Sequence, residues 1–273
     1  LTGLPFASKN EGVMHACGHD GHMSILLGAA AVLNEMKDQI HGTVKIVFQP
    51  AEEEAAIGGG RHIAASGKLD DVSEIYGLHE LPTGQVGLKP GALMAASDRF
   101  YVHIKGKSTH AAQPHNGTDA LVAAAHFIID VQSLISREMN PMDNVVCTIG
   151  LMNAGTRYNV GVEDAYLEGT CRTYRPELRN KMEARLEEIL KGLDVMFHTH
   201  SELNYVRGHS ATINTPEKID FLKKVGKVYL GEEHITEPEF PSMCAEDFSS
   251  YLEKFPGAFF WLGTGDGNTP ALH

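Results

Sequence analysis

The alternation of helical and strand-like segments constrains the fold of this chain more than any single motif. Amphipathic helices are expected where apolar residues recur at helical spacing, and strands where short apolar runs are bounded by glycine or proline. In the outer parts of the chain these segments are helices at 23–36, 61–66 and 217–229, a short helical segment that begins at 243–248, and strands at 43–48, 74–78 and 257–262. Helices that alternate with short apolar strands predict an α/β fold, a mainly parallel sheet with helices on both faces.

Between residues 98 and 213 the order of the segments changes. The expected strands are at 100–104, 144–152, 165–174 and 201–206, and the expected helices are at 118–136 and 176–193. This order, strand-helix-strand-strand-helix-strand, is typical of ferredoxin-like α+β domains. With 273 residues the chain is long enough for two domains. We therefore predict that residues 98–213 form an inserted domain, and that residues 1–97 and 214–273 together form the domain with the mainly parallel sheet.

Charge and cysteine content narrow the partners and the compartment. The formal net charge is −12 at pH 7, which argues against nucleic acid or an anionic membrane surface as the main partner. No apolar run is expected to be long enough to cross a bilayer. The four cysteines are scattered rather than arranged as a disulfide framework, so a reducing compartment, the cytoplasm, is expected.

Both ends of the sequence look truncated. The chain opens on Leu1 rather than on methionine, and it stops at His273 directly after a glycine-rich loop. The absence of a targeting segment is therefore weak evidence about location.

Residues 14–22 (MHACGHDGH) combine three histidines, a cysteine and an aspartate. Cys17 and His19 are two positions apart, a spacing that points both side chains the same way in an extended segment. A thiolate and an imidazole that converge in this way suit zinc or a similar transition metal. The spacing fits no common structural zinc pattern, so a polar loop with one buried cysteine is an equally good interpretation of these residues alone. The helix that follows, capped by Asp20 or Ser24, is expected to point its free amides at this thiolate.

Further candidate ligands come directly after predicted strands, where a parallel sheet binds its ligands. They are Glu52 and Glu53 after 43–48, His79 after 74–78 and His273 after 257–262. A single catalytic metal takes about three protein ligands, so five ligands and a spare carboxylate are better matched to two metal ions. The side chains of Glu52 and Glu53 are expected to diverge because the residues are adjacent. One can then bind metal while the other is a free general base.

Four segments of the chain together resemble a known family, the aminoacylase-like metallo-amidohydrolases. The closest branch includes hippurate hydrolase, N-acetyl-diaminopimelate deacetylase and the plant hydrolases of indoleacetic acid–amino acid conjugates. The resemblance runs essentially end to end, and its ordered motifs are MHACGHDGH at 14–22, FQPAEE at 48–53, GLH at 77–79 and STHAAQPH at 108–115.

The resemblance implies a binuclear metal site in the larger domain and a smaller lid domain that often mediates dimerisation. By motif match the metal ligands are Cys17, His19, Glu53, His79 and His273. Glu52 matches the general base. His110 matches a lid histidine that stabilises the tetrahedral oxyanion, in some relatives from the partner subunit. Asn159 matches a position that contacts the substrate.

These implications predict an amidohydrolase that uses two divalent ions, manganese, zinc, cobalt or nickel. It would cleave the amide bond of a small N-acyl amino acid, and it would be a homodimer that binds neither nucleic acid nor membrane. A dipeptidase-type metallopeptidase on the same scaffold is the alternative within this class. A catalytically inactive binding relative and a structural zinc module are the alternatives outside it, although neither needs a free base beside its ligands.

Several other residues have simpler interpretations. His110 by itself could be an ordinary polar residue at a strand end. Glu246 and Asp247 lie in a motif like that of the family, but a capping role at a helix start is equally plausible. His209 is interpreted as a surface residue. The family has Ile-Pro where this chain has Gly161-Val162, which leaves the details of substrate binding near Asn159 open.

Overall fold

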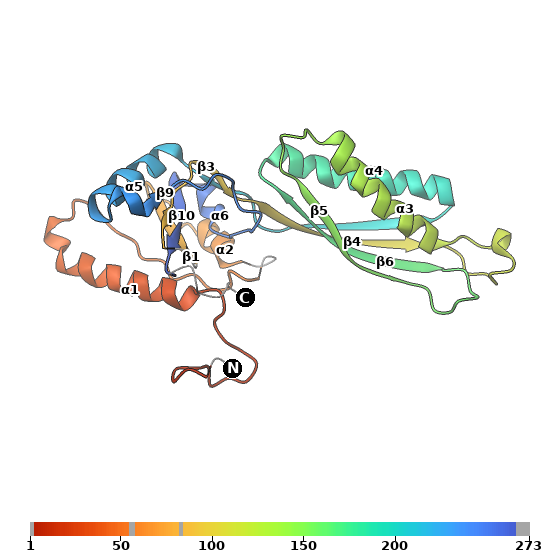
Figure 1. The fold of residues 1–273 in the computed structure, drawn as a ribbon, viewed down its shortest axis with the longest axis horizontal. Coiled ribbons are helices and arrows are strands. Elements are labelled where there is room, and N and C mark those ends of the chain that lie inside the picture. The colour runs from red at the N-terminus through yellow and green to blue at the C-terminus, as the bar shows by residue number, and fades with distance from the viewer. Residues whose placement is uncertain (1–2, 55–57, 82–83, 266–273) are drawn as a thin grey trace.

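Two four-stranded sheets lie in two lobes of the computed structural model, which describes residues 3–54, 58–81 and 84–265 (Figure 1). The first lobe contains α1 (His19–Glu35), η1 (Lys37–Gln39), α2 (Gly59–Ala65), β1 (Ile75–Leu81), β2 (Val86–Gly87), β3 (Gly91–Met94), β8 (Thr212–Asn214), α5 (Pro216–Tyr229), η4 (Glu232–His234), β9 (Ile235–Thr236), α6 (Ser249–Leu252) and β10 (Gly257–Gly263). The second lobe contains β4 (Ala96–Lys105), η2 (Pro114–Asn116), α3 (Ala120–Ser133), η3 (Leu134–Glu138), β5 (Val146–Ala154), β6 (Asp164–Thr173), α4 (Pro176–Phe197) and β7 (His200–Arg207).

The second lobe has the predicted order strand-helix-strand-strand-helix-strand. Its strands pair antiparallel in the spatial order β5-β6-β4-β7. Every second residue of β4 is fully buried, namely Phe100, Val102 and Ile104, as expected for a strand with one face on a core. On α4 the buried residues recur about every fourth position and include Met182 and Leu186, so that one helical stripe packs onto the sheet.

The first lobe has a mixed sheet in the spatial order β1-β10-β2-β9. β1 pairs parallel with β10, and β2 pairs parallel with β9, whereas β10 and β2 are antiparallel. Two of these three pairings are therefore parallel. The apolar strand at 257–262 was expected to be central, and β10 does lie between β1 and β2.

Two of the predictions for the first lobe are wrong. Residues 43–48 form no strand, because they pair with no other strand in the part of the chain that the structure describes, and Val44 and Ile46 are exposed. The helical segment expected at 243–248 starts only at Ser249.

The two segments that join the lobes are hydrogen-bonded to each other. Ser97 donates its backbone N–H to the carbonyl of His209 at 3.0 Å, and Gly208 donates its N–H to the carboxylate of Asp98 at 3.1 Å. Asp98 is only 1% exposed, and it also accepts from the guanidinium of Arg179 and the hydroxyl of Tyr205. A buried carboxylate with this many donors is well compensated, and it ties β4, α4 and β7 together.

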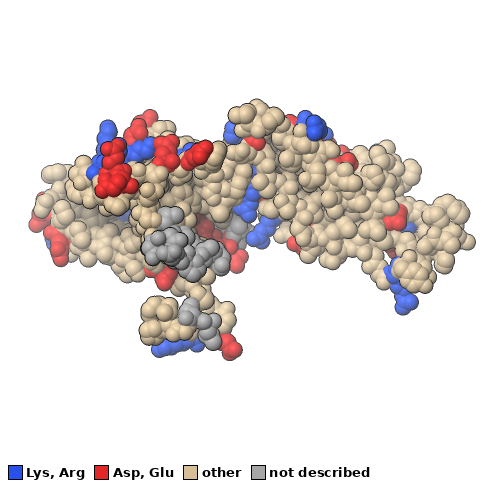
Figure 2. Space-filling view, in the orientation of Figure 1, with Lys and Arg blue, Asp and Glu red and all other residues tan. Residues whose placement is uncertain are grey.

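α3 is unusually apolar on both of its faces. With η3 it forms 19 continuous helical residues, and an 18-residue window within them has a mean hydropathy of 1.3, so the prediction that no apolar run could cross a membrane is wrong by length and composition. Phe127 and Val131 are fully buried in the second lobe, which is the pattern of a core helix. On the opposite face, Val122 and Ile129 are 44% and 61% exposed. Charged residues gather over the α5 side of the first lobe, whereas the visible face of the second lobe has few (Figure 2).

Candidate metal centre and active site

Cys17, His19 and His79 come together in the first lobe. One ligand atom from each lies within 4.8 Å of the others, and the Cys17 Sγ is 3.4 Å from the His79 Nε2. His79 is on β1 and 8% exposed. Its Nδ1 is 2.8 Å from the carbonyl oxygen of Glu80, which must accept, so Nδ1 carries the proton and Nε2 is left for a ligand.

The turn before α1 aims Cys17 and His19 at this point. α1 begins at His19, and its N-cap is Gly18 with φ 86°, without any side-chain cap. The expected capping by Asp20 or Ser24 is therefore wrong. Gly18 also allows a close approach, because a Cβ there would lie 1.9 Å from the carboxylate of Glu80.

Glu52 and Glu53 reach the same place from the loop after residues 43–48. One oxygen of each lies within 4.8 Å of a His19 ring nitrogen, and the distance from His19 Nε2 to Glu52 Oε2 is 3.8 Å. The predicted divergence of the two carboxylates is therefore wrong. It rested on the adjacency of the two residues alone, but Ala51 has φ 61°, in the left-handed region, and the glutamates lie in the turn that follows.

Glu246 and Asp247 form a third group with Glu52, which the sequence left open as helix capping. They are 6% and 1% exposed. A buried pair of acids after a proline-rich, irregular stretch is the signal that could have marked them, because carboxylates are almost never fully buried without a partner.

Burial makes the carboxylates of this centre weaker acids. It raises the pKa of Glu52 to about 7, with further contributions from Asp247 and Glu53. Burial, and then the charge of Glu52, also raise the pKa of Glu246 well above its usual range. The pKa of Cys17 rises to about 12, first by burial and then by the charges of Glu53 and Glu52. So many anionic groups in one place are stable together only when protons or cations neutralise them.

The loops after β4 and β5 meet at the far tip of the second lobe (Figure 1). His110 belongs to the first of these loops and Asn159 to the second, and His110 bridges Val160 across them. The carbonyl of Asn159 accepts from the Ala111 N–H at 3.1 Å, and the Ala112 N–H donates to His110 Nδ1 at 3.1 Å. β4 leads from the junction of the lobes toward this tip, and its ten residues span about 30 Å at about 3.3 Å each. The single chain therefore does not bring His110 and Asn159 to the metal centre.

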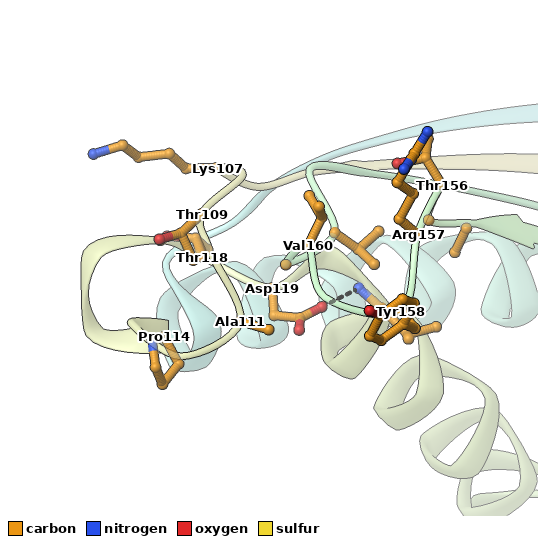
Figure 3. Close-up of a pocket in the computed structure, with 16 residues that line it drawn as sticks. Lys107, Thr109, Ala111, Pro114, Thr118, Asp119, Thr156, Arg157, Tyr158 and Val160 are labelled. Atoms are coloured by element: carbon orange, nitrogen blue, oxygen red, sulfur yellow. Dashed lines mark hydrogen bonds between the residues drawn. The ribbon is translucent and has the colours of Figure 1, made fainter.

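A cavity of about 570 Å³ lies beside these two residues (Figure 3). Its walls include Lys107 and Arg157, two cations, and Tyr158, whose side chain is 99% exposed. Asp119, which also lines the cavity, is the N-cap of α3, and its carboxylate accepts a hydrogen bond from the Leu121 N–H at 2.9 Å. The tip is thus a polar, open surface.

The sequence did not reveal two groups near the junction of the lobes, a histidine and an arginine. His209, predicted at the surface, is 6% exposed, and burial lowers its pKa. Arg172 is half-buried at the junction end of β6, close enough to His209 to lower that pKa further. Burial also lowers the pKa of Arg172, and among the described residues its side chain forms neither an ion pair nor a hydrogen bond. His273, the fifth predicted ligand, lies outside the described residues.

These features can be compared with those of known proteins. The sequence profile of peptidase family M20/M25/M40 matches residues 1–273. N-acetyl-L-cysteine deacetylase of Bacillus subtilis (strain 168) is 39% identical over 270 residues, which cover 98% of this chain and 64% of that protein. N-acetyldiaminopimelate deacetylase of Shouchella clausii (strain KSM-K16) is 38% identical over 267 residues, 96% of this chain and 70% of that protein. This chain thus spans less than two thirds of the first relative's length.

Solved structures give the same result. A dinuclear metal binding peptidase of the M20 family from Bacillus subtilis is 34% identical and superposes with a TM-score of 0.83. The superposition covers 100% of this chain and 70% of that one.

Proposed function

Because the chain belongs to peptidase family M20/M25/M40, we propose that it is a metal-dependent amidohydrolase that cleaves the amide bond of an N-acyl amino acid. Water and the substrate give a carboxylate and a free amino acid. The observation that carries the proposal is the meeting of two donor groups at His19, with Cys17 and His79 in one and Glu52 and Glu53 in the other. Neither a binding module nor a structural zinc site needs a carboxylate with a pKa near neutral beside its ligands.

The donor set fits two divalent cations. Sulfur, imidazole and carboxylate ligands together suit manganese, zinc, cobalt or nickel. The raised pKa of Cys17 fits as well, because a cation is what would keep that thiol deprotonated at neutral pH. We assign Cys17, His19, Glu53, His79 and His273 as the ligands. Ions bound there would lower the pKa of a water molecule and polarise the substrate carbonyl.

Glu52 is the general base. Its carboxylate takes the proton from the attacking water and then gives it to the nitrogen of the leaving amine. A pKa near 7 before metal binding shows that burial already favours proton uptake at this side chain. Its distance of 3.8 Å from His19 Nε2 puts its carboxylate beside the assigned ligands, within reach of a water molecule there, which supports this role.

The oxyanion-stabilising histidine comes from a second copy of the chain. His110 and Asn159 are at the tip of the second lobe, about 30 Å along β4 from the junction, so they reach a metal centre most simply in a partner subunit. The exposed apolar face of α3, with Val122 and Ile129, supports a homodimer formed through the second lobe. Residues 98–213 are then an inserted ferredoxin-like lid and dimerisation domain between the two parts of the catalytic domain, 1–97 and 214–273.

The substrate is a small anionic amide. Two relatives are named deacetylases of N-acetyl amino acids, and every N-acyl amino acid carries a carboxylate. Arg172 offers a half-buried cation near His209, and among the described residues its guanidinium forms neither an ion pair nor a hydrogen bond, which suits that carboxylate. We place the enzyme in the cytoplasm, where the free Cys17 would stay reduced.

The test is a panel assay on metal-free and metal-reconstituted protein. The panel contains N-acetyl amino acids, hippurate, N-acetyl-diaminopimelate and dipeptides. Two ions per chain and turnover of at least one N-acyl amino acid, absent in the metal-free protein, are expected. Turnover of dipeptides alone would replace the proposal with the peptidase, and two bound ions without any turnover would favour a relative that only binds.

A further inference from the structure

The loop that carries the general base has a strained backbone. Ala51, the residue before Glu52, has φ 61°, a left-handed conformation that is unfavourable for a non-glycine residue. Such a turn persists only when the surrounding structure holds it on both sides. The contacts of residues 49 and 50 on one side, and of 58–60 on the other, therefore decide where Glu52 points.

Asp247 holds both sides of this turn. Before the turn, the Gln49 side chain donates its Nε2–H to Asp247 Oδ1 at 2.6 Å. After the turn, Gly60 at the start of α2 donates its backbone N–H to Asp247 Oδ2 at 2.8 Å. Tyr251 completes the network by donating its hydroxyl to Gln49 Oε1 at 2.7 Å. The backbone N–H of Asp247 also donates to Glu52, which lowers the pKa of that carboxylate against the opposing effect of burial.

Two glycines make this anchoring possible. A Cβ on Gly60 would lie 2.6 Å from the Asp247 carbonyl oxygen, and a Cβ on Gly59 would lie 2.0 Å from the Pro50 carbonyl oxygen. Only glycine lets the start of α2 come this close to both Asp247 and the loop.

Asp247 is buried and is held by its own hydrogen bonds, as an anchor requires. It is 1% exposed, and each carboxylate oxygen already accepts a hydrogen bond from protein, one from a side chain and one from the backbone. Breaking either bond would leave a buried donor or acceptor unsatisfied.

We propose that Asp247, with Gln49 and Tyr251, is the positioning network that holds Glu52 in place for proton transfer. The proposal rests on the proposed function, in which Glu52 is the general base. Misplacement of a reacting group by about 1 Å can lower a rate by about 100-fold, so loss of the anchor affects kcat. Among the described ligands, Cys17, His19 and His79 come from other elements and Glu53 alone shares the turn with Glu52, so metal binding is affected far less than kcat.

The test is an exchange of donor and acceptor between two side chains. In Asp247→Asn, one oxygen becomes an NH₂ group that faces the Gln49 NH₂ group, and the two donors oppose each other. The double variant Gln49→Glu with Asp247→Asn restores the pattern: the new amide donates to the new carboxylate, which still accepts from Tyr251, and the asparagine oxygen accepts from Gly60. The charge of the pair is unchanged. Asp71→Asn, at an exposed surface position, is the matched control for loss of an aspartate.

Asp247→Asn is expected to lower kcat about 30-fold, with KM changed less than about 3-fold and the metal content lowered far less than kcat. The double variant should regain at least 10-fold of this loss, Tyr251→Phe should lower kcat about 3- to 10-fold, and Asp71→Asn should leave kcat unchanged. A kcat that does not fall, a loss of metal equal to the loss of rate, or a double variant no better than the single one would each overturn the proposal.

Hydrogen exchange provides a readout that does not need turnover. The Gly60 amide, which donates to Asp247, should exchange at least 10-fold faster in metal-free Asp247→Asn and return toward the parent rate in the double variant. If the parent protein hydrolyses no member of the panel, the proposed function fails while this exchange still tests the anchor. Unchanged exchange in Asp247→Asn would overturn the anchor even in an active enzyme.

Discussion

The metal centre of the first lobe and the tip of the second lobe are built in opposite ways. Around Glu52, contacts between residues far apart in sequence bury the groups, such as the Gln49–Asp247 hydrogen bond across 198 positions. At the tip, His110 is exposed: its ring accepts a hydrogen bond from the Ala112 N–H two positions away, and its backbone bridges Val160 in the loop after β5. The first region is thus assembled within one chain, whereas the second presents its polar groups outward. The difference supports a composite site, in which one copy supplies metals and base and another supplies His110.

The largest expected effect comes from removing the base on the assembled side. Glu52→Gln keeps the size of the side chain but cannot take a proton, so kcat should fall roughly 1,000-fold, within the usual range for general base catalysis. Metal content, measured by elemental analysis, should stay at two ions per chain because Glu52 is not assigned as a ligand. A loss of metal parallel to the loss of rate would instead make Glu52 a ligand and leave the base unassigned.

The next effect concerns the outward-facing tip. His110→Ala should lower kcat about 100-fold, as expected for loss of one oxyanion donor, while metal content stays unchanged. Its thermal stability should also stay unchanged, because the His110 side chain is exposed and, within residues 3–54, 58–81 and 84–265, its only hydrogen bond is from the Ala112 N–H.

Mixing two inactive proteins separates the composite site from a site within one chain. A heterodimer of Glu52→Gln and His110→Ala contains one intact site if the histidine crosses between subunits. After subunit exchange, the mixture should regain up to about a quarter of the parent activity, since half of the dimers are mixed and each has one working site of two. No recovery after verified subunit exchange would place His110 and Glu52 of the same chain in one site.

The same contrast explains what could be predicted from sequence. The second lobe follows local periodicity, such as the alternate burial of Phe100, Val102 and Ile104, so its elements were predicted to within a few residues. Residues 43–48 show the same kind of local signal but form no strand, because a strand also requires a neighbour that the periodicity does not reveal.

The site shows the same limit. The family and its motif residues were predicted from short segments, and the structure brings Cys17, His19 and His79 together. The convergence of Glu52 and Glu53 was missed because it depends on the backbone conformation of Ala51. The burial of His209 was missed because it depends on how the two lobes join. Local sequence does not encode either contact.

The pH dependence of stability distinguishes the buried carboxylates from exposed ones. Glu52 has a pKa of about 7 in the folded metal-free chain and an ordinary pKa near 4.5 when unfolded, so the folded state binds more protons between these values. Its contribution to stability is full below about pH 4.5 and is lost as the pH rises through 7. The thermal midpoint of chelator-treated protein should fall by several degrees between pH 5 and 8, and Glu52→Gln should flatten this slope. Equal slopes in both proteins would show that Glu52 is not buried in solution as described.

The smallest expected effect is on the stability of the tip itself. Tyr158 is 99% exposed, so Tyr158→Ala should change the free energy of unfolding by less than about 0.5 kcal/mol. If the tip enters a partner's site, the same ring becomes partly buried there, and its removal should raise KM or the dimer dissociation constant several-fold. Equilibrium unfolding, steady-state kinetics and sedimentation measure the three quantities, with Tyr229→Ala, 81% exposed at the end of α5 in the first lobe, as the matched control. The control should leave all three quantities unchanged. If Tyr158→Ala also leaves them unchanged, the tip does not contact a partner through this ring. The contrast between the two regions would then rest on His110 alone.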